Sequence, residues 1–392
     1  MEQLKKVKTA VVGCGMISNS YIHNLSRLFS VIDLTAVCDI NRAAAEEKAR
    51  TYGVGRIMTA EEIAADPDIE LVVNLTAAPA HYAVIRQMVL AGKHVYTEKM
   101  FTTDLAQSRE LTALAKEKGV MIAAAPDTVL GAGVQTARYL LDRGLAGEIT
   151  SGLVSVTRNQ NLNSEIYKFL RQEGGSIPYD VGIYYIGALI ALLGPVEAVR
   201  AFAAPALPHQ KELLFDTANP EEWTIPGSNL ITAALQFACG ALVSVHFNGN
   251  TVGAQHSALQ LYGTRAVMEL GDPDTFRGEV RLTYPDAQPV SMPFTHGYNG
   301  INALPEHFPY EFYGHRGIGA ADLAYAIRTG RSARLGGEYG LHCQEILQGM
   351  DEAARTGATY TLRSRCEVRP LAPGFYSSEN GSRRDAERSL MD

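Results

Sequence analysis

Two patterns of hydrophobic and polar positions alternate over the first third of the chain. Short apolar runs, typical of buried strands, are separated by longer stretches in which apolar residues recur at helical spacing. The predicted strands lie near residues 8–12, 33–38, 69–75, 93–97 and 120–125. Helix boundaries are marked by Pro79 at a helix start, Asp104 with Gln107 as a capping pair, and Gly92 and Gly119 as C-terminal stops. This alternation predicts a parallel sheet with helices on both faces, whose ligand crevice lies at the carboxyl ends of the strands.

The pattern changes after Asp127. A helix is predicted over about 130–143, closed by Gly144, and runs rich in Val, Leu, Thr and Tyr follow it. These predicted strands lie at 149–158, 196–204, 229–238, 240–247, 256–263, 266–270, 280–284 and 288–292, with two helices afterwards at about 316–329 and 338–356. Neighbouring runs are close enough to form hairpins, so we predict an α+β domain with a large, open, mainly antiparallel sheet. The mixed-charge segment 373–392 is expected to be a flexible tail or an arm on a partner subunit.

The first predicted strand runs directly into a glycine-bearing turn, Gly13-Cys-Gly-Met-Ile-Ser18, and then into a helix. Gly13 would allow a sharp turn, and Gly15 would let a pyrophosphate reach the backbone N–H groups of the helix N-terminus. The second strand ends at Asp39, about 20 residues further on, where a carboxylate would bind a ribose 2′-OH and repel a 2′-phosphate. We therefore predict an α/β Rossmann domain that binds NAD over residues 1–126 and a substrate domain over 127–372. NADP stays possible through Arg42, and a tight turn without a ligand is the structural alternative.

Composition narrows the class of protein. The 392 residues are 46% hydrophobic and 20% charged, a balance typical of soluble globular proteins. The formal net charge of −7 gives no electrostatic reason to expect a nucleic acid or an anionic membrane as partner. The five cysteines show no framework spacing, the N-terminus lacks the apolar core of a signal peptide, and the apolar run Ile183 to Gly194 is too short to cross a bilayer. A cytoplasmic protein is expected.

Two further stretches carry side chains suited to catalysis. Glu98 and Lys99 follow a predicted strand at the crevice, and Asp180 and Tyr184 lie four residues apart at the start of an apolar helix. If the two domains meet across a cleft, the Lys99 ammonium would lower the pKa of the Tyr184 phenol, which could then accept a proton from a substrate hydroxyl. Asp180 would orient that hydroxyl or hold Lys99. In the alternative interpretation Asp180 caps the helix, Lys99 is solvated, and Tyr184 and Tyr185 are core aromatics. One residue of helix register decides which tyrosine faces the site.

Other polar residues along the chain are candidates for binding. The ten histidines contain no metal-ligand pair at helical spacing, so no metal site is predicted, and only His81 is expected at the mouth of the crevice. Asn159, which ends the first strand of the second domain, would hydrogen-bond a polyol or belong to a solvated loop. The residues predicted to contact the cofactor are Gly13, Gly15, Met16, Ile17, Asp39, Asn74, Thr76, His81, Glu98 and Lys99. Those predicted to contact the substrate are Lys99, Asn159, Asp180, Tyr184 and Tyr185, of which Lys99, Asp180 and Tyr184 are the catalytic candidates.

Four stretches together resemble the glucose-fructose oxidoreductase, inositol dehydrogenase and rhizopine-catabolism family (Gfo/Idh/MocA). They are residues 11–18, 91–99, 174–184 and 341–346. The resemblance implies a Rossmann domain, a C-terminal domain with a large open sheet, and NAD(P)-dependent redox chemistry on sugars or cyclitols. The family's Glu-Lys pair near the nicotinamide ribose and the reacting hydroxyl is matched by Glu98 and Lys99, and its catalytic Asp and His by Asp180 and Tyr184. Two positions depart from the family pattern, because Met100 replaces the proline after the lysine and Tyr184 replaces the usual histidine.

The function expected from this resemblance is hydride transfer between nicotinamide and a hydroxyl carbon of a sugar, cyclitol or glycoside. Tyr184 would exchange the hydroxyl proton and Lys99 would polarise the oxygen. Two alternatives stay open: NAD-dependent glycoside cleavage through a transient 3-keto sugar, and a regulator that binds nucleotide and sugar without chemistry. Family members associate through the open sheet, so the resemblance also implies a homodimer or homotetramer.

Overall fold

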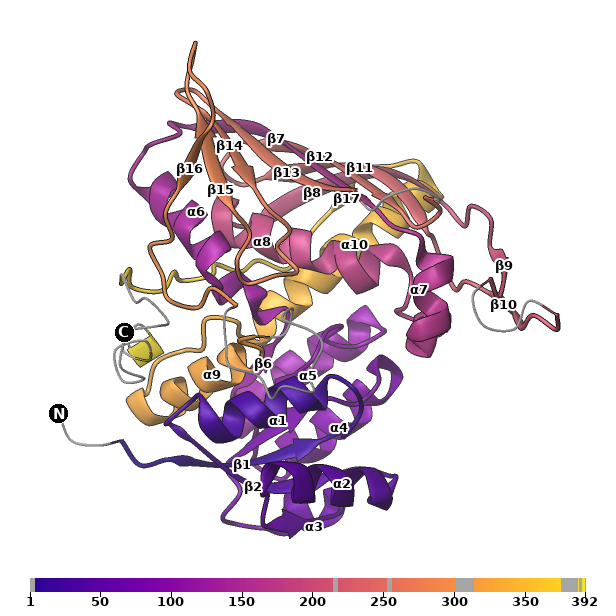
Figure 1. Cartoon of the computed structure of the whole chain (residues 1–392), viewed down its shortest axis with the longest axis vertical. Helices are drawn as coiled ribbons and strands as arrows, with labels where there is room; N and C mark the ends of the chain where they lie inside the picture. Colours follow the sequence, from indigo (N-terminus) through magenta and orange to yellow (C-terminus); the bar gives the residue numbers. More distant parts are fainter. Residues whose placement is uncertain are drawn as a thin grey trace.

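The computed structural model describes residues 4–213, 218–251, 256–300, 314–374, 387, 390 and 391. These residues fold around two sheets, with the N-terminal sheet in the lower half of Figure 1 and a larger sheet at its top. The predicted fold class is confirmed, because a parallel Rossmann sheet is followed by a C-terminal domain whose sheet is mainly antiparallel.

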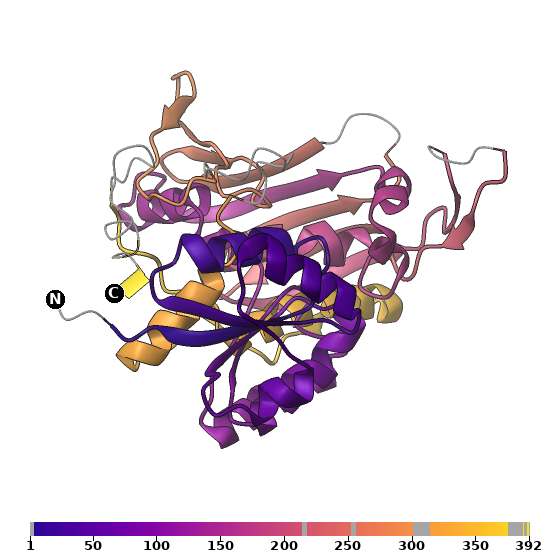
Figure 2. The same ribbon diagram turned by 60° about the horizontal axis from the view of Figure 1, so that its bottom comes forward.

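The N-terminal sheet has six parallel strands in the order β3-β2-β1-β4-β5-β6, so the strand order reverses between β1 and β4. The strands are β1 (Val7–Val12), β2 (Ile32–Cys38), β3 (Arg56–Ile57), β4 (Leu71–Asn74), β5 (His94–Thr97) and β6 (Ile122–Ala124). The helices between them are α1 (Ser18–Arg27), α2 (Arg42–Tyr52), α3 (Ala60–Ala65), α4 (Ala78–Leu90) and α5 (Leu105–Lys118). Helices cover both faces of this sheet (Figure 2), which is why all but one of the residues of β1 and all those of β4 are buried.

The predicted helix boundaries are confirmed for α4 and α5. Asp104 caps α5 by accepting the N–H of Gln107 at 3.0 Å, and Gly119 ends the helix in the left-handed region at φ 68°. Helix α4 carries Pro79 in its first turn, and Gly92 follows its end at φ 75°. These local signals therefore set the length of both helices correctly.

The second sheet has nine strands in the order β16-β15-β14-β13-β7-β12-β11-β8-β17. Its neighbouring strands are antiparallel except for β7 and β12, which are parallel. The strands are β7 (Ile149–Thr157), β8 (Val196–Ala204), β11 (Leu230–Phe237), β12 (Leu242–Asn248), β13 (His256–Gly263), β14 (Val267–Leu270), β15 (Val280–Thr283), β16 (Val290–Met292) and β17 (Tyr360–Thr361).

One face of this sheet packs on helices α6 (Ala132–Asp142), α8 (Ile183–Leu193) and α10 (Gly337–Thr356), which lie below it in Figure 1. Along β11 every second residue is buried, because alternate side chains point to opposite faces. The other face is open within the described part of the chain. No helix formed by the described residues is long and apolar enough to span a bilayer.

Several short elements were not predicted. They are β3, the hairpin of β9 (His209–Lys211) and β10 (Glu222–Thr224), β17, and helix α7 (Gln160–Ile166). None has a run of apolar residues long enough to give a periodicity. Helix α8 also begins differently from the prediction, since a π-helical turn, Pro178–Gly182, precedes it.

The end of the chain returns to the N-terminal sheet. Helix α9 (Ile318–Thr329) packs there, and the Ala124 N–H at the edge strand β6 donates to the Leu335 carbonyl at 2.9 Å. Within the predicted tail, Glu387 is buried and accepts hydrogen bonds from the Tyr325 hydroxyl at 2.6 Å and from Ser30. At this residue the tail packs on its own chain.

Candidate active site

The glycine-bearing turn after β1 has the shape that a pyrophosphate needs. Gly13 lies at φ +101°, and a Cβ at this position would sit 2.6 Å from the carbonyl carbon of Leu75. At Gly15 nothing lies within 4 Å of an added Cβ, so the approach to the N-terminus of α1 is clear. The Ser18 hydroxyl closes the turn by donating to the Gly15 carbonyl at 2.6 Å. The turn therefore fits a dinucleotide pyrophosphate bound at a helix N-terminus.

Asp39 lies at the carboxyl end of β2, beside this turn. Its carboxylate accepts the N–H of Cys14 at 2.7 Å and that of Asn41 at 2.8 Å. Met16, on the turn itself, is 56% exposed. Arg42, the residue that would favour NADP, pairs with Glu46 at 3.0 Å on the surface of α2. The arrangement suits a ribose with a free 2′-OH.

Asn74 and Thr76 lie at the carboxyl end of β4 and hydrogen-bond each other. The Asn74 side chain is fully buried, accepts from the Thr76 hydroxyl at 2.8 Å and donates to Thr97 at 3.1 Å. His81 is also fully buried, and its two ring nitrogens face the carbonyls of Met100 at 2.5 Å and Thr76 at 2.8 Å. His81 thus ties together the turns after β4 and β5, and neither ring nitrogen is left to face the crevice as the sequence analysis expected.

Lys99 and Asp180 meet although they are 81 positions apart in sequence. The Lys99 ammonium donates to the Asp180 carboxylate at 2.6 Å and to its backbone carbonyl at 2.8 Å. Both side chains are mostly buried, at 15% and 20% exposure. Asp180 lies in the π-helical turn and makes no capping hydrogen bond, so it is not the helix cap of the alternative interpretation. The peptide bond between Lys99 and Met100 is cis.

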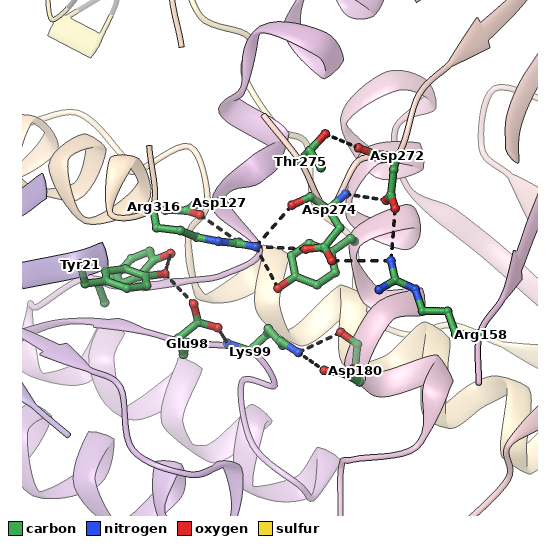
Figure 3. Close-up of polar contacts among 12 residues, drawn as sticks. Tyr21, Glu98, Lys99, Asp127, Arg158, Asp180, Asp272, Asp274, Thr275 and Arg316 are labelled. Carbon is green, nitrogen blue, oxygen red and sulfur yellow. Dashed lines mark hydrogen bonds and ion pairs between the residues drawn. The ribbon is translucent and has the colours of Figure 1, made fainter. Parts of the chain in front are cut away.

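Glu98 faces the N-terminal domain. Its carboxylate accepts from the Tyr21 hydroxyl at 2.6 Å and from the Lys99 N–H at 2.8 Å, and it is 7% exposed. Figure 3 shows Glu98 between Tyr21 and Lys99. Glu98 thereby fixes the backbone from which the Lys99 side chain extends.

Tyr184 lies between two cations. The Lys99 ammonium is 5.4 Å from the centre of its ring, and the Arg316 guanidinium donates to its hydroxyl at 3.2 Å. Burial raises the pKa of the Tyr184 phenol well above its ordinary value, and the nearby Arg316 guanidinium offsets only part of that increase. The expected lowering of this pKa is therefore wrong, because the cost of burying the phenolate outweighs the charge of the neighbouring guanidinium.

Tyr185 has different neighbours, among them Asp272 and Arg158. It is fully buried, and burial followed by the charge of Asp272 raises its pKa. Asn159 is the N-cap of α7, where its side-chain oxygen accepts the N–H of Leu162 at 3.1 Å. Of the two tyrosines, Tyr184 is the one placed next to Lys99.

A charged network that the sequence analysis missed closes the site on the side of the large sheet (Figure 3). Arg316, 2% exposed, contacts Asp274 at 3.1 Å and Asp127 at 3.5 Å. Arg158 pairs with Asp272 at 3.2 Å and lies 3.8 Å from Asp274. Within the described residues, no group of three or more His, Cys, Asp or Glu side chains is placed to hold a metal ion.

The position of Asp127 could have been predicted from the sequence, because it follows β6 at the same carboxyl edge of the sheet as the other candidate residues. Its carboxylate accepts the N–H groups of Gly317 at 2.8 Å and Gly319 at 3.3 Å. Arg316 likewise lies in a glycine-rich stretch, as the first residue of the helix predicted over about 316–329. Arg158, Asp272 and Asp274 lie at strand ends of the large sheet, and their spacing in sequence does not reveal that they meet.

Comparisons with known proteins identify the family of the chain. Residues 7–125 match the profile of an oxidoreductase family with an NAD-binding Rossmann fold, and residues 134–269 match the Gfo/Idh/MocA C-terminal domain. An uncharacterised oxidoreductase of Schizosaccharomyces pombe is 30% identical over 50% of this chain and 54% of its own length. The NADP-dependent scyllo-inositol 2-dehydrogenase of Bacillus subtilis is 29% identical over 50% and 54%. These alignments thus span about half the length of the curated relatives.

The whole fold is also found in solved structures. A levoglucosan dehydrogenase in complex with NADH and levoglucosan superposes with a TM-score of 0.76 at 20% identity, covering 91% of this chain and 99% of that one. At this level of identity the likeness establishes the fold. Together the two family profiles cover well over half of the sequence, and the chain belongs to the Gfo/Idh/MocA family of NAD-binding oxidoreductases.

Proposed function

We propose that the protein is a sugar or cyclitol dehydrogenase that uses NAD, with Lys99, Asp180 and Tyr184 as its catalytic residues. The observation that supports this most directly is the Lys99–Asp180 pair beside the Tyr184 ring, at the edge of the Rossmann sheet where the nucleotide turn also lies. Bound nicotinamide would donate or accept the hydride.

Lys99 has two of its three N–H groups engaged by Asp180. The third can donate to a substrate oxygen, and the ammonium stabilises the negative charge that develops there. Asp180 keeps the ammonium in place through its two acceptors. The pair therefore polarises the reacting oxygen without itself having to change protonation state.

Tyr184 is the candidate for proton exchange. Because burial raises the pKa of its phenol, the hydroxyl keeps its proton at neutral pH and is ready to donate it to a carbonyl that is being reduced. Oxidation of a hydroxyl requires the same group to accept a proton, which high pH favours. Arg316 donates a hydrogen bond to the phenol oxygen and so stabilises the ionised phenolate that hydroxyl oxidation requires.

Three further choices follow from the site. We propose NAD over NADP, since Asp39 would repel a 2′-phosphate and Arg42 is paired with Glu46. Sugars and cyclitols are proposed as substrates because the chain is similar in sequence to a scyllo-inositol and a D-xylose dehydrogenase and in fold to a levoglucosan dehydrogenase. All five cysteines are free thiols, which supports a reducing, cytoplasmic location, and assembly through the open sheet face is proposed from the family resemblance.

The first experiment releases and identifies any retained cofactor, then follows absorbance at 340 nm while NAD is supplied with inositols, xylose, levoglucosan and aryl glycosides. Steady NADH formation with a polyol supports the proposal. Consumption of a glycoside without net NADH would replace it by glycoside cleavage through transient oxidation. If the protein binds NAD but exchanges hydride with none of these compounds, the proposal fails in favour of a regulator that binds nucleotide without chemistry.

A further inference from the structure

Phe169 is an exposed aromatic side chain next to the proposed reacting centre. It belongs to the short 3-10 helix Lys168–Arg171, which follows α7, and its side chain is 49% exposed. Its ring centre lies 6.0 Å from the Lys99 ammonium. That distance is the outer limit of a cation–π contact. The Tyr167 ring lies 6.2 Å from the Phe169 ring at an interplanar angle of 52°, and the Phe169 side chain stays half-exposed beside both neighbours.

The segment that carries Phe169 is firmly held. Leu170 is buried, and a Cβ on Gly175 would lie 2.5 Å from the Leu170 carbonyl oxygen, so the chain is closely packed here. The Gln160 side chain hydrogen-bonds the Gly175 carbonyl. Gly174 lies opposite Ala78 at the start of α4, because a Cβ there would be 3.7 Å from the Ala78 side chain. The segment therefore reaches from the large sheet to the Rossmann domain, beside the site.

The hairpin of β9 and β10 supports this segment from outside. The Arg171 guanidinium stacks on the Trp223 ring at 3.6 Å and pairs with Glu221 at 2.7 Å, and Lys168 also reaches Glu221 at 3.3 Å. Figure 1 shows α7 and the hairpin next to each other at the right-hand side of the molecule. The hairpin thus fixes the two residues that flank the Phe169–Leu170 pair.

We propose that Phe169 is the surface on which the ring of a cyclic substrate stacks, and that the β9–β10 hairpin positions it through Arg171 and Trp223. This inference rests on the proposed function. The C–H face of a pyranose or cyclitol is apolar, and an aromatic ring beside a few polar groups is how concave sites commonly orient such molecules. With the ring on Phe169, a substrate hydroxyl lies within reach of Lys99. An open-chain polyol presents no such face and gains little.

The test compares Phe169→Ala and Phe169→Tyr with Ile166→Ala. Ile166, the last residue of α7, is a matched control because it is 50% exposed and lies three positions before Phe169. Calorimetry on NADH-loaded protein measures the Kd of the best cyclic substrate and that of an open-chain hexitol. The KM for the cyclic substrate and the Kd for NAD are measured alongside. Phe169→Ala should raise the Kd and KM for the cyclic compound about 3- to 10-fold. The hexitol and NAD values should change less than about 2-fold, and Phe169→Tyr and Ile166→Ala should behave as wild type.

Other outcomes overturn the proposal. An unchanged affinity for the cyclic compound removes the stacking role, and a weaker Kd for NAD with unchanged sugar binding would make Phe169 part of the cofactor site. A change in oligomeric state in Phe169→Ala would make it a subunit contact. If wild type forms no NADH with any compound, the proposed function fails while the calorimetric affinities still decide the role of Phe169. A wild type that binds no cyclic polyol overturns both.

Discussion

Replacing Arg316 should be among the most damaging single changes in the chain. Its guanidinium is 2% exposed and contacts Tyr184, Asp127 and Asp274 at 3.2, 3.5 and 3.1 Å. In Arg316→Gln both carboxylates lose the guanidinium, and only Asp274 keeps a second cation, Arg158 at 3.8 Å. Removing one partner from a buried pair costs about 3–5 kcal/mol, because the remaining charge is left without compensation.

Two features place the expected loss near the lower limit of that range. Asp127 keeps the N–H groups of Gly317 and Gly319, and the Asp274 side chain is 27% exposed and reaches solvent. We therefore expect Arg316→Gln to lower the free energy of unfolding by about 3 kcal/mol at neutral pH.

The loss should depend on pH in a defined direction. Burial already raises the pKa of Asp127 and Asp274, and removing the guanidinium raises both further. A carboxyl group whose folded pKa lies above its unfolded value stabilises the fold at low pH and loses that contribution as pH rises through the folded pKa. Arg316→Gln should therefore be less destabilised at pH 5 than at pH 8.

Urea unfolding followed by circular dichroism measures these differences. Arg42→Gln is the control, because the Arg42–Glu46 pair is exposed and should be worth less than about 1 kcal/mol. In the double variant with Asp274→Asn, the two losses should fall short of additivity by about 1–3 kcal/mol. A loss below about 1 kcal/mol in Arg316→Gln, or strict additivity with Asp274→Asn, would refute the idea that this network is a coupled unit.

Four further predictions concern the site and the core. Lys99→Met and Tyr184→Phe should each lower kcat by about 10²-fold or more with unchanged NAD affinity, and near wild-type turnover would remove their catalytic roles. Because burial raises the pKa of Tyr184, hydroxyl oxidation should speed up from neutral to alkaline pH, and a flat profile of kcat would count against proton transfer to this phenol. Gly13→Ala should lower both the Tm and the affinity for NAD, because its Cβ would lie 2.6 Å from backbone atoms. Gly15→Ala should weaken NAD binding alone, because nothing lies within 4 Å of its Cβ. Equal Tm values for the two variants would contradict this reasoning. Burial lowers the pKa of His342 to about 4. The neutral imidazole should therefore contribute stability on the order of 3 kcal/mol above pH 6.5, and this contribution should be lost as the pH falls towards 4. Unfolding measured between these pH values should show a smaller loss of stability in His342→Gln than in the wild type.

Much of the fold followed from the sequence because its signals are local. Each strand of the N-terminal sheet except β3 contains at least three consecutive buried residues, and α5 is delimited by Asp104 and Gly119. The short elements β9 and α7 were missed because their positions depend on contacts with distant segments, such as that between Asn161 and Lys211.

The candidate site was only partly predictable, for a related reason. Lys99 and Asp180 could be linked from the sequence, because a buried carboxylate needs a partner and because the family resemblance also implied that the two share a site. The partners of Tyr184 could not, since Arg316 comes from a segment 132 positions later. The pKa of Tyr184 was predicted in the wrong direction because helical spacing says nothing about how deeply a phenol is buried.

The contact between β6 and the segment before α10 also bears on how the protein is made. Ala123 forms an isolated bridge with Gly336, and the Ala124 N–H reaches the Leu335 carbonyl at 2.9 Å. During synthesis the last strand of the nucleotide-binding sheet is therefore finished long before the residues that hydrogen-bond its outer edge leave the ribosome. An unpaired strand edge can pair with the strands of other chains. We therefore expect the nascent N-terminal half to bind a chaperone until the rest of the polypeptide has been synthesised.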